Sequence, residues 1–499
     1  MIFSLSAAHN NAVRSRPTSL ADPLSALANG GMVTTLRIAL SAASRGFVRI
    51  AGALLTCGSI AKLKFGKWGI RLGEKIKVVI LGANGTMGAG AACIFAGAGF
   101  EVIMLARDRD KALAGLKAAQ NAARAEAVAE SIKLGSYQSN LESSVRDAGF
   151  IFESLAEDLA LKRHFFELVD RFRGPNAIVA TGSSGLSIAE MSKGRSEAFR
   201  RHFLGVHLFN PPHVIVGTEV IPGADTDPAI VKSVVAMLTK RLGRKVIITK
   251  DRPAFVGNRV GFKVLNEVAL LAAEHGVAFM DYLIGPQTGR AMAPLATIDL
   301  VGWDVHKAIV DNVHQNCEDE AHASFELPAY IEKGISAGRL GDKTPERGGF
   351  YRKSGKDTLV LDPKTGLHAP LERPAPLDFV EKMKSLNRVG RYREAMTVFR
   401  EARGADADLC RHVVLGYVSY GLNRVGEVAA SAADVDSIMS YGFNWAPPTA
   451  IVDLIGARET ISLLERLNLA VPPVLEQAAR QSAKMFTGGV LDYGRAFVG

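Results

Sequence analysis

The sequence predicts an α/β domain with a parallel sheet, followed by two all-helical units that are copies of one another. A strand, a glycine-rich turn, a helix and a second strand follow one another between residues 77 and 105. Helical periodicity replaces the strand patterns after residue 251. A segment that ends in Pro-x4-Asp-Leu-(Val/Ile)-Gly occurs twice, over 281–302 and 436–456, which indicates a duplicated helical unit.

The strands and helices of the α/β domain follow from apolar runs and from the breaks between them. Short apolar runs predict buried strands, and the longer stretches between them predict helices. The expected strands are Lys77–Leu81, Glu101–Leu105, Phe150–Glu153, Ala177–Thr181, an apolar run that ends at His207, and Lys245–Thr249. The expected helices are Ala89–Ala96, residues 110–132, Ile188–Met191, residues 229–242, and one whose first turn lies near Glu157.

The glycine-rich turn after the first strand predicts a dinucleotide site. Gly82 permits the tight turn, Gly85 lets a pyrophosphate approach the backbone, and Gly88 allows close packing of helix on strand. The helix that follows offers amide donors to phosphate. The Gly-x-x-Gly-x-x-Gly spacing is one residue longer than usual, but its place between a strand and a helix favours cofactor binding. The expected cofactor residues here are Gly82, Asn84, Gly85, Thr86, Met87 and Gly88.

The end of the second strand bears on the choice between NAD and NADP. An acid at this place usually binds the ribose 2′-hydroxyl, but here Ala106 is followed by Arg107. Arg107 either accommodates a 2′-phosphate or is a solvated loop charge, and Asp108 is an alternative partner for the hydroxyl.

His207 stands at the end of an apolar run and directly before Asn210-Pro211-Pro212, which continues neither a helix nor a central strand. Open α/β sheets bind their ligands where strands end. Glu219 follows a second apolar run, so its carboxylate is expected beside the imidazole, where it would fix the tautomer and leave one nitrogen as a base. Taken alone, this spacing favours a structural histidine and a surface glutamate over a catalytic pair.

A stretch of small hydroxyl residues follows another strand. Ser183 and Ser184, flanked by Gly182 and Gly185, come directly after Thr181. Such residues at a strand end either meet a ligand or cap the next helix.

Residues 1–73 hold nine Lys or Arg residues and one acid, so they carry most of the net charge of +10. This surplus leaves the rest nearly neutral, which gives no support to nucleic-acid binding by the folded part. We expect a poorly ordered basic extension, with cytoplasmic localisation, or a mitochondrial matrix location if the extension is a transit peptide. The apolar run 50–60 is too short to span a membrane. Four widely spaced cysteines suggest neither a metal site nor disulfides.

The sequence therefore divides into five parts. Three prolines within seven residues mark a linker at 370–376. The expected limits are 1–74 for the extension, 75–250 for the dinucleotide-binding domain, 251–369 for the first helical domain, 370–376 for the linker and 377–499 for the second helical domain.

Over about residues 75–499 the chain resembles the 3-hydroxyacyl-CoA dehydrogenase family. The resemblance rests on several motifs in the family's order, which are specific only together. They are Gly-Thr-Met-Gly-Ala-Gly at 85–90, Glu-Asp-Leu-Ala-Leu-Lys at 157–162, Ser-Ser at 183–184, His-Leu-Phe-Asn-Pro at 207–211, Phe-Val-Gly-Asn-Arg at 255–259 and the glycine-rich loop 338–351.

The resemblance implies a Rossmann-type NAD-binding domain followed by two duplicated C-terminal domains of the all-α 6-phosphogluconate-dehydrogenase-like kind. It places the family's catalytic set on Ser184, His207, Glu219 and Asn258. Glu157 and Lys162 match a pair that lies near the cofactor in family members. The helical tail looks like the dehydrogenase half of bacterial multifunctional fatty-acid oxidation proteins, whose hydratase part has no counterpart here.

This resemblance implies reversible oxidation of a 3-hydroxyacyl-CoA to a 3-ketoacyl-CoA in fatty-acid metabolism, with an acyl-CoA as the substrate. Two alternatives stay open: a dehydrogenase of a free hydroxy acid with the same architecture, and a non-catalytic structural relative. The complete catalytic set argues against the second. We also expect the duplicated helical domain to permit a monomer, because it would take the place of a partner's helical domain.

The sequence departs from the family pattern at three places. The glycine turn has gained a residue around Asn84, and Ala106 stands where an acid is usual, so both NAD and NADP are open as cofactors. Gly182 and Gly185 replace an Asn and a Ser beside the catalytic serine, which bears on contacts to the nicotinamide or the thioester.

Overall fold

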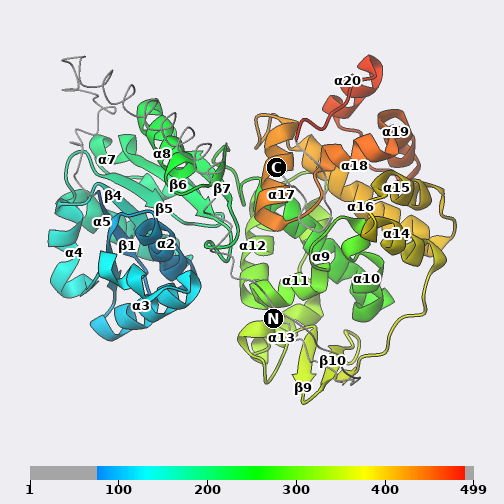
Figure 1. Ribbon diagram of the computed structural model, residues 1–499, viewed down its shortest axis with the longest axis horizontal. Helices are drawn as coiled ribbons and strands as arrows, with labels where there is room; N and C mark the ends of the chain where they lie inside the picture. Colours follow the sequence, from blue (N-terminus) through cyan, green and yellow to red (C-terminus); the bar gives the residue numbers. More distant parts are fainter. Residues whose placement is uncertain (1–75, 489–499) are drawn as a thin grey trace, which may run out of the picture. The chain divides into compact units, whose positions relative to one another are not determined.

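The computed structural model describes residues 76–488 as one structural unit (Figure 1). The expected extension over residues 1–74 and the apolar run 50–60 lie outside the described residues. Within residues 76–488, no helix is both long and apolar enough to cross a membrane. The limits at 250, 369 and 377 stay predictions.

The first part of the unit is built on an eight-stranded sheet in the order β3-β2-β1-β4-β5-β6-β7-β8. The first six strands in this order are parallel, which is the arrangement of dinucleotide-binding α/β sheets. β7 runs antiparallel to β6, and β8 runs parallel to β7. The strands are β1 (Lys77–Leu81), β2 (Glu101–Ala106), β3 (Ile132–Ser136), β4 (Phe150–Glu153), β5 (Ile178–Thr181), β6 (Phe203–Leu208), β7 (Gly217–Pro222) and β8 (Lys245–Ile248).

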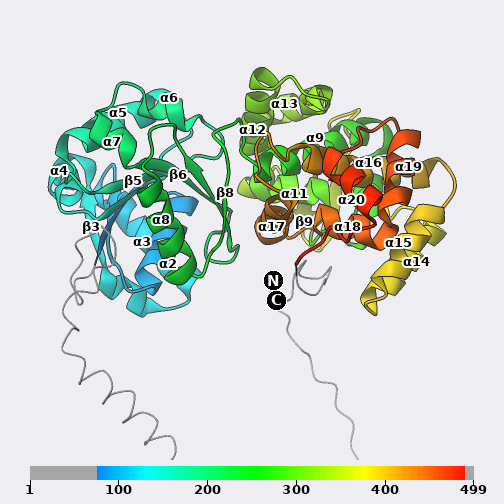
Figure 2. The ribbon, with the colours of Figure 1, turned by 90° about the horizontal axis from the view of Figure 1, so that it is seen from above.

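Helices cover both faces of this sheet, which explains why its central strands are continuous apolar runs (Figure 2). On one face lie α2 (Thr86–Gly97), α3 (Arg109–Ala123) and α8 (Pro228–Lys240). On the other lie α4 (Tyr137–Arg146), α5 (Leu159–Phe172), α6 (Ile188–Ser192) and α7 (Glu197–Arg201). The crossovers that follow β1 and β4 lie on opposite faces, so the sheet opens a crevice at the carboxyl ends of these neighbouring strands.

The expected parallel α/β architecture is confirmed, but the helix expected over 110–132 is wrong in its second half. α3 ends at Ala123, Arg124 takes a left-handed conformation, and a 3-10 turn leads into β3 at Ile132. Within residues 76–488, β3 pairs with β2 alone and exposes Lys133, so it is an edge strand there. Too few of its side chains are apolar for the pattern to reveal it, and its pairing with β2 decides its conformation.

The remainder of the described chain is mainly helical and shares one apolar core. The first group comprises α9 (Gly257–His275), α10 (Val277–Leu283), α11 (Pro294–Val301), α12 (Trp303–Asn316) and α13 (Ala329–Ser336). A small antiparallel sheet follows, made of β9 (Tyr351–Ser354), β10 (Asp357–Leu361) and β11 (His368–Pro370). The second group comprises α14 (Asp378–Arg388), α15 (Tyr392–Glu401), α16 (Ala405–Asn423), α17 (Ala432–Phe443), α18 (Pro448–Ile455), α19 (Ala457–Arg466) and α20 (Pro473–Gln481). The segment expected as a linker begins with the last residue of β11 and otherwise contains no helix or strand.

The repeated sequence motif folds in the same way in both copies. α11 and α18 each begin with a proline and end at a glycine of positive φ, Gly302 at 101° and Gly456 at 107°. The carboxylate of Asp281 accepts the N–H groups of two residues in the first turn of α11, and that of Asp436 accepts the N–H of Thr449 in α18.

The second aspartate of each repeat, in the Pro-x4-Asp motif, also has the same structural role in both copies. Asp299 accepts the backbone N–H groups of Phe350 and Tyr351 at 2.9 and 2.8 Å, and thereby holds the glycine-rich loop against α11. Asp453 accepts two consecutive N–H groups of the C-terminal segment, both at 3.0 Å. The Pro, Asp and Gly of the motif thus recur because each has a local structural role.

The two repeats meet through equivalent residues. Ala291 N–H donates to the carbonyl of Asn444 at 3.2 Å, and Ala446 N–H donates to the carbonyl of Gly289 at 2.6 Å. Gly289 and Asn444 both end a helical segment in the left-handed conformation. Such reciprocal contacts are what two subunits related by a two-fold axis make with each other.

Candidate active site

The glycine turn after β1 has the shape that a dinucleotide requires. Gly82 has φ 77°, and a Cβ there would collide with the carbonyl oxygen of Ser154 in the turn after β4. A Cβ on Gly88 would collide with the carbonyl of Gly82. These two glycines therefore permit the close approach of α2 to both strands.

The middle of this turn is open to a ligand. Asn84, Gly85 and Thr86 are exposed, and Met87 is half-buried. A Cβ on Gly85 would make only ordinary contact within the chain, at 3.5 Å, so its lack of a side chain leaves room on the outside. The first turn of α2 contains no acid, and its N-terminus favours an anion. The residues present thus fit a dinucleotide phosphate.

The two candidates for the ribose contact differ in their surroundings. The carboxylate of Asp108 accepts the N–H of Lys111 at 2.8 Å and caps α3, so it already has a structural role. Arg107 is exposed at the end of β2. Its charge opposes the rise in the pKa of Tyr137 that burial causes, and the Tyr137 hydroxyl accepts the N–H of Gly82 at 2.8 Å. The N–H of Ala83 in the glycine turn donates to the carbonyl of Leu105 at 3.2 Å, so Arg107 follows the part of β2 that contacts this turn.

A buried network lies beyond the glycine turn, at the ends of β4 and β5. The fully buried carboxylate of Glu153 accepts hydrogen bonds from Lys162 Nζ at 2.7 Å, Thr181 Oγ1 at 2.6 Å and the N–H of Leu155 at 2.6 Å. Lys162 Nζ also lies 3.4 Å from Glu157. Burial disfavours the charged form of Lys162, but the two carboxylates outweigh it and raise its pKa above the ordinary lysine value.

Glu157 joins this network to the serine loop. Its Oε1 accepts the Ser183 hydroxyl at 2.5 Å and the N–H of Ser184 at 2.8 Å. Glu157 lies just before Asp158, the cap of α5, and thus near the first turn of this helix, as expected. The capping interpretation of the serines is wrong, because Ser187 caps α6. Ser183 thus orients the loop, and among residues 76–488 the Ser184 hydroxyl has no hydrogen-bond partner.

His207 and Glu219 are direct neighbours across the β6–β7 ladder. Directly opposite residues share a face of the sheet, and His207 Nδ1 lies 2.7 Å from Glu219 Oε2 with both side chains buried. The carboxylate accepts the Nδ1 hydrogen, which leaves Nε2 as the free nitrogen. Glu219 lies inside β7. The apolar run that was expected to lead up to Glu219 belongs to the loop before this strand. The pairing of β7 with β6, and not this run, brings Glu219 to His207.

The other oxygen of Glu219 holds the start of α9. Glu219 Oε1 accepts the N–H groups of Val256 and Gly257 at 2.9 and 3.0 Å. The next residue on α9 is Asn258, whose side-chain amide donates to the carbonyl of Ser184 at 3.0 Å. One carboxylate therefore brings the imidazole, the catalytic asparagine of the resemblance and the serine loop into one site.

Asn312 on α12 makes a second contact to the serine loop. Its Nδ2 donates to the carbonyl of Gly185 at 3.1 Å, and its Oδ1 accepts Nδ2 of Asn316 at 3.1 Å. A Cβ on Gly185 would lie only 3.0 Å from Asn312 Nδ2 and 3.3 Å from Ala254. The loop thus reaches α12 because residue 185 has no side chain.

The turn into α9 is strained. Ala254 and Phe255 are consecutive non-glycine residues with φ of 60° and 51°, and both are fully buried. Left-handed conformations cost such residues about 1–2 kcal/mol each. The ring of Phe255 lies 5.8 Å from the imidazole of His207, so this strained turn forms one wall of the site.

The structure thus brings together Ser184, His207, Glu219 and Asn258, and separately groups the glycine turn with Arg107. Glu157 and Lys162 lie between these two groups. Sequence reasoning missed Glu153 and Asn312. An acid at the end of a wholly apolar strand was a usable signal for Glu153, whereas a lone asparagine late in a helix gave none for Asn312.

Comparison with known proteins agrees with this geometry. Residues 77–252 match the model of the 3-hydroxyacyl-CoA dehydrogenase NAD-binding domain, and residues 255–353 match the C-terminal domain of the same family. The first match supports NAD as the cofactor.

Relatives and solved structures extend the likeness. A probable 3-hydroxyacyl-CoA dehydrogenase of Deinococcus radiodurans is 33% identical over 292 residues, which are 56% of this chain and 83% of the relative. One from Bacillus subtilis is 31% identical over 370 residues, 71% of this chain, but the match spans only 46% of that longer protein. The crystal structure of 3-hydroxybutyryl-CoA dehydrogenase from Escherichia coli shares the fold, with a TM-score of 0.60 at 20% identity over 82% of this chain and 99% of that one.

The Glu153–Lys162 pair generates a test of the buried network. Lys162→Met should lower the free energy of unfolding by about 3–5 kcal/mol, because it leaves a buried carboxylate without its cation. Adding Glu153→Gln to this variant should restore part of the loss. Urea unfolding at neutral pH measures both effects. Because the folded-state pKa of Lys162 is raised, the loss should shrink as the pH rises past the ordinary lysine pKa. A double variant no more stable than Lys162→Met alone would contradict this account.

Proposed function

Because the chain belongs to the 3-hydroxyacyl-CoA dehydrogenase family, a family of oxidoreductases, we propose that it oxidises an (S)-3-hydroxyacyl-CoA reversibly to the 3-ketoacyl-CoA. The observation that carries this proposal is the buried His207–Glu219 pair, which the start of α9 holds beside the Ser184 loop. The chain spans about half the length of one relative, so the reaction is proposed for this chain from its own site.

The glycine turn would hold the cofactor. Gly82, Gly85 and Gly88 would receive the pyrophosphate at the N-terminus of α2, and Glu157 with Lys162 would lie near the nicotinamide end of the site. Bound there, a nicotinamide ring supplies the hydride acceptor of the reaction. The position of Arg107 supports a tolerance for the 2′-phosphate of NADP beside the use of NAD.

His207 is proposed as the base. Its Nδ1 is occupied by Glu219, so the free Nε2 takes the proton of the 3-hydroxyl as the carbonyl forms, and returns it in the reverse direction. Glu219 stabilises the protonated imidazole that results. Its own position is fixed by two backbone amides, so little reorganisation accompanies the proton transfer.

Ser184 and Asn258 are proposed to bind the substrate oxygens. The Ser184 hydroxyl has no partner in the described part of the chain, which suits a donor that waits for substrate. Asn258 now donates to the Ser184 carbonyl, so binding of an acyl-CoA would exchange or share this hydrogen bond. Donors held in place beside a developing oxyanion commonly contribute a few kcal/mol to a rate.

The direct test is an activity screen with 3-hydroxyacyl-CoA substrates of varied chain length, each with NAD and with NADP. A free 3-hydroxy acid serves as the control, since turnover without CoA would favour the alternative of a hydroxy-acid dehydrogenase.

We further propose a role in fatty-acid β-oxidation or related acyl-CoA metabolism in the cytoplasm. Growth on fatty acids after gene deletion and microscopy of a tagged chain would test these two points.

We also propose that the chain works as a monomer. The reciprocal hydrogen bonds between 289–291 and 444–446 support this, because they place two equivalent segments of one chain where two subunits would meet. Trp445 of the second repeat also covers the buried guanidinium of Arg290, at 4.7 Å from its ring centre.

Replacement of His207 should remove turnover and spare cofactor binding. For His207→Ala we expect kcat to fall by roughly 10²–10⁴-fold, the usual contribution of a general base, with the NAD dissociation constant nearly unchanged. Glu219→Gln should lower kcat more than it raises KM, and should move the acidic limb of the pH–rate profile to lower pH. Steady-state kinetics and NAD titration measure these effects. Retention of most of the wild-type kcat in His207→Ala would remove His207 from the mechanism.

Arg107→Ala should discriminate between the two cofactors. We expect measurable NADP activity in the wild type, and a larger loss of kcat/KM with NADP than with NAD in the variant, because only NADP carries the 2′-phosphate. Parallel kinetics with both cofactors decide the matter. Equal losses would show that Arg107 does not contact the 2′ position.

A chain that ends at Glu372 tests the monomer proposal. It keeps β11 but loses the second helical group, so the apolar side of α9 that packs on α16 becomes exposed. We expect the full chain to sediment as an active monomer, and the shortened chain to dimerise or aggregate. A shortened chain that remains monomeric, soluble and fully active would show that the second group is not a built-in partner.

A further inference from the structure

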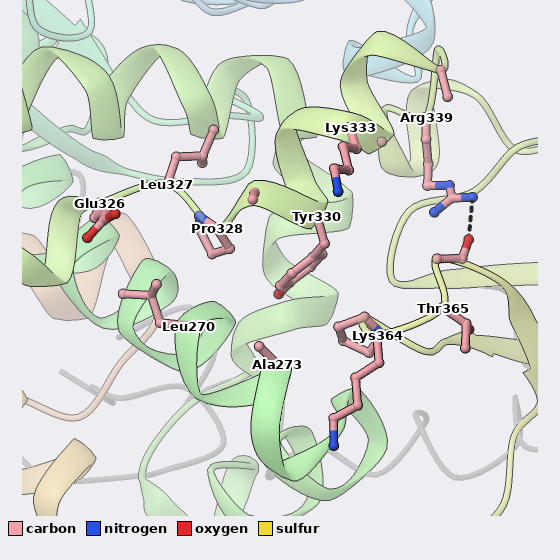
Figure 3. Close-up of a pocket in the computed structure, with 15 residues that line it drawn as sticks. Leu270, Ala273, Glu326, Leu327, Pro328, Tyr330, Lys333, Arg339, Lys364 and Thr365 are labelled. Carbon is pink, nitrogen blue, oxygen red and sulfur yellow. Dashed lines mark hydrogen bonds between the residues drawn. The ribbon is translucent and has the colours of Figure 1, made fainter.

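Helix α9 carries Asn258 at its start, and its surroundings change along its length. Residues 257–269 are all buried, and α16 and α17 of the second helical group pack against this helix. The C-terminal half of α9 instead borders a pocket of about 790 Å³, which Leu270 and Ala273 line together with Pro328 and Tyr330 (Figure 3). The chain therefore packs most closely around the end of α9 that belongs to the candidate site.

A glycine lets the second helical group approach the first turns of α9. A Cβ on Gly261 would collide with the ring of Phe443, the last residue of α17. The ring centre of Phe443 lies 5.7 Å from that of Phe209, which in turn lies 4.6 Å from the centre of the His207 imidazole. The second helical group thus comes within one side chain of the proposed base.

Arg259 directly follows Asn258 and binds the second helical group. Its guanidinium is buried, and Nε donates to the hydroxyl oxygen of Tyr420 at 2.8 Å. Its Nη2 donates to Asp319 Oδ2 at 2.6 Å and to Glu427 Oε1 at 3.0 Å. Tyr420 lies near the end of α16, and Glu427 lies in the loop after this helix. Two of these three partners therefore belong to the second helical group.

Asp319 joins three elements at a single oxygen. It lies in the turn after α12, the helix whose Asn312 binds the serine loop. Its Oδ2 also accepts the Tyr420 hydroxyl and Arg424 Nη1, both at 2.9 Å. Burial disfavours the charged carboxylate, but hydrogen bonds, above all the one from Arg259, outweigh burial and hold the pKa of Asp319 below its ordinary value.

Arg424 completes the network with two further carboxylates. Its Nη2 donates to both oxygens of Glu320 at 2.7 Å, and its Nη1 donates to Glu427 at 2.6 Å. The guanidinium also lies over the ring of Tyr420, at 4.5 Å from the ring centre. Bidentate and charge-assisted hydrogen bonds fix side-chain geometry more strictly than single neutral ones. The network therefore ties the end of α16 to the start of α9 and to the turn after α12.

We propose that Tyr420 is a positioning residue for the reaction and that it acts on Asn258 through Arg259. Glu219 holds the start of α9 from the sheet, and Tyr420 holds it from the second helical group. The inference rests on the function proposed for Asn258, because this tie affects turnover only if Asn258 binds the substrate. The second helical group thus takes part in the reaction without touching the substrate.

Tyr420→Phe removes the hydroxyl and keeps the ring. Arg259 Nε then lacks its acceptor, so the neighbouring Asn258 is held less firmly. We expect kcat with a 3-hydroxyacyl-CoA to fall by about three- to tenfold, less than the roughly 10²-fold that a displacement of 1 Å can cost. The NAD dissociation constant should stay nearly unchanged, because the glycine turn lies outside this network.

Tyr417→Phe is the matched control. Tyr417 lies one turn earlier on α16 and is equally buried, but its hydroxyl donates to the carbonyl of Ala446 at 2.9 Å. The substitution thus removes a buried hydroxyl of the same kind outside the network, and it should leave kcat unchanged.

A double-variant cycle separates positioning from a purely structural role. If Tyr420 acts through Asn258, then Tyr420→Phe causes no further loss of kcat in the Asn258→Ala enzyme. A structural role predicts the same factor of loss in both backgrounds, or an equal loss in Tyr417→Phe. Either of these results would overturn the inference.

Hydrogen exchange tests the tie without reference to turnover. The N–H groups of Val256 and Gly257 donate to Glu219, so a peptide that spans residues 254–262 should exchange faster in Tyr420→Phe than in the wild type or Tyr417→Phe. A wild type that turns over no acyl-CoA would refute the proposed function, and the exchange rates would still decide whether Tyr420 holds α9. Unchanged exchange in Tyr420→Phe, or an unchanged kcat in an active enzyme, would overturn the inference.

Discussion

The Glu219 carboxylate is the group on which the candidate site depends. It is fully buried, and it accepts three hydrogen bonds from two separate parts of the chain: the imidazole of His207 on β6 and two backbone amides at the start of α9. The positive end of a helix favours such an anion. Removal of the carboxylate would leave all three donors without partners in the interior, at a cost of about 1–3 kcal/mol for each. The same group thus orients the imidazole and ties the helix that carries Asn258 to the sheet.

Sequence reasoning reached the members of this site but not the way they meet. The prolines after His207 predict the end of a strand, and the acid twelve residues later is close enough to return. Their contact requires that the two residues be directly opposite in the ladder, and that register is set by the pairing of β7 with β6 and β8. The role of Glu153 could not be predicted for the same reason. Its partner Lys162 lies a full turn into the next helix, and the contact between the two side chains is visible only in the folded chain.

The duplication was visible in the sequence because its residues have local tasks. Proline starts the short helix, aspartate binds loop amides and glycine ends the helix, so the spacing survives while the rest diverges. The contact between the repeats could not be recognised in the sequence, because its two equivalent positions hold different residues, Arg290 and Trp445. An interface between two copies in one chain is free of the requirement that both sides be identical. Each copy can therefore specialise, one with a buried cation and the other with the aromatic ring that covers it.

The two glycines beside Ser184 show how a departure from the family pattern is compensated. A Cβ on Gly182 would lie 2.8 Å from the ring of Phe152, and one on Gly185 would lie 3.0 Å from the amide of Asn312. The loop therefore packs closer to the sheet and to α12 than side chains at these positions would allow. The side-chain amides of Asn312 and Asn258 donate to consecutive carbonyls of the loop. Two residues of the helical part therefore hold the loop in place. The substitutions change how the loop is fixed, and they make the position of Ser184 depend on the same helix that Glu219 anchors.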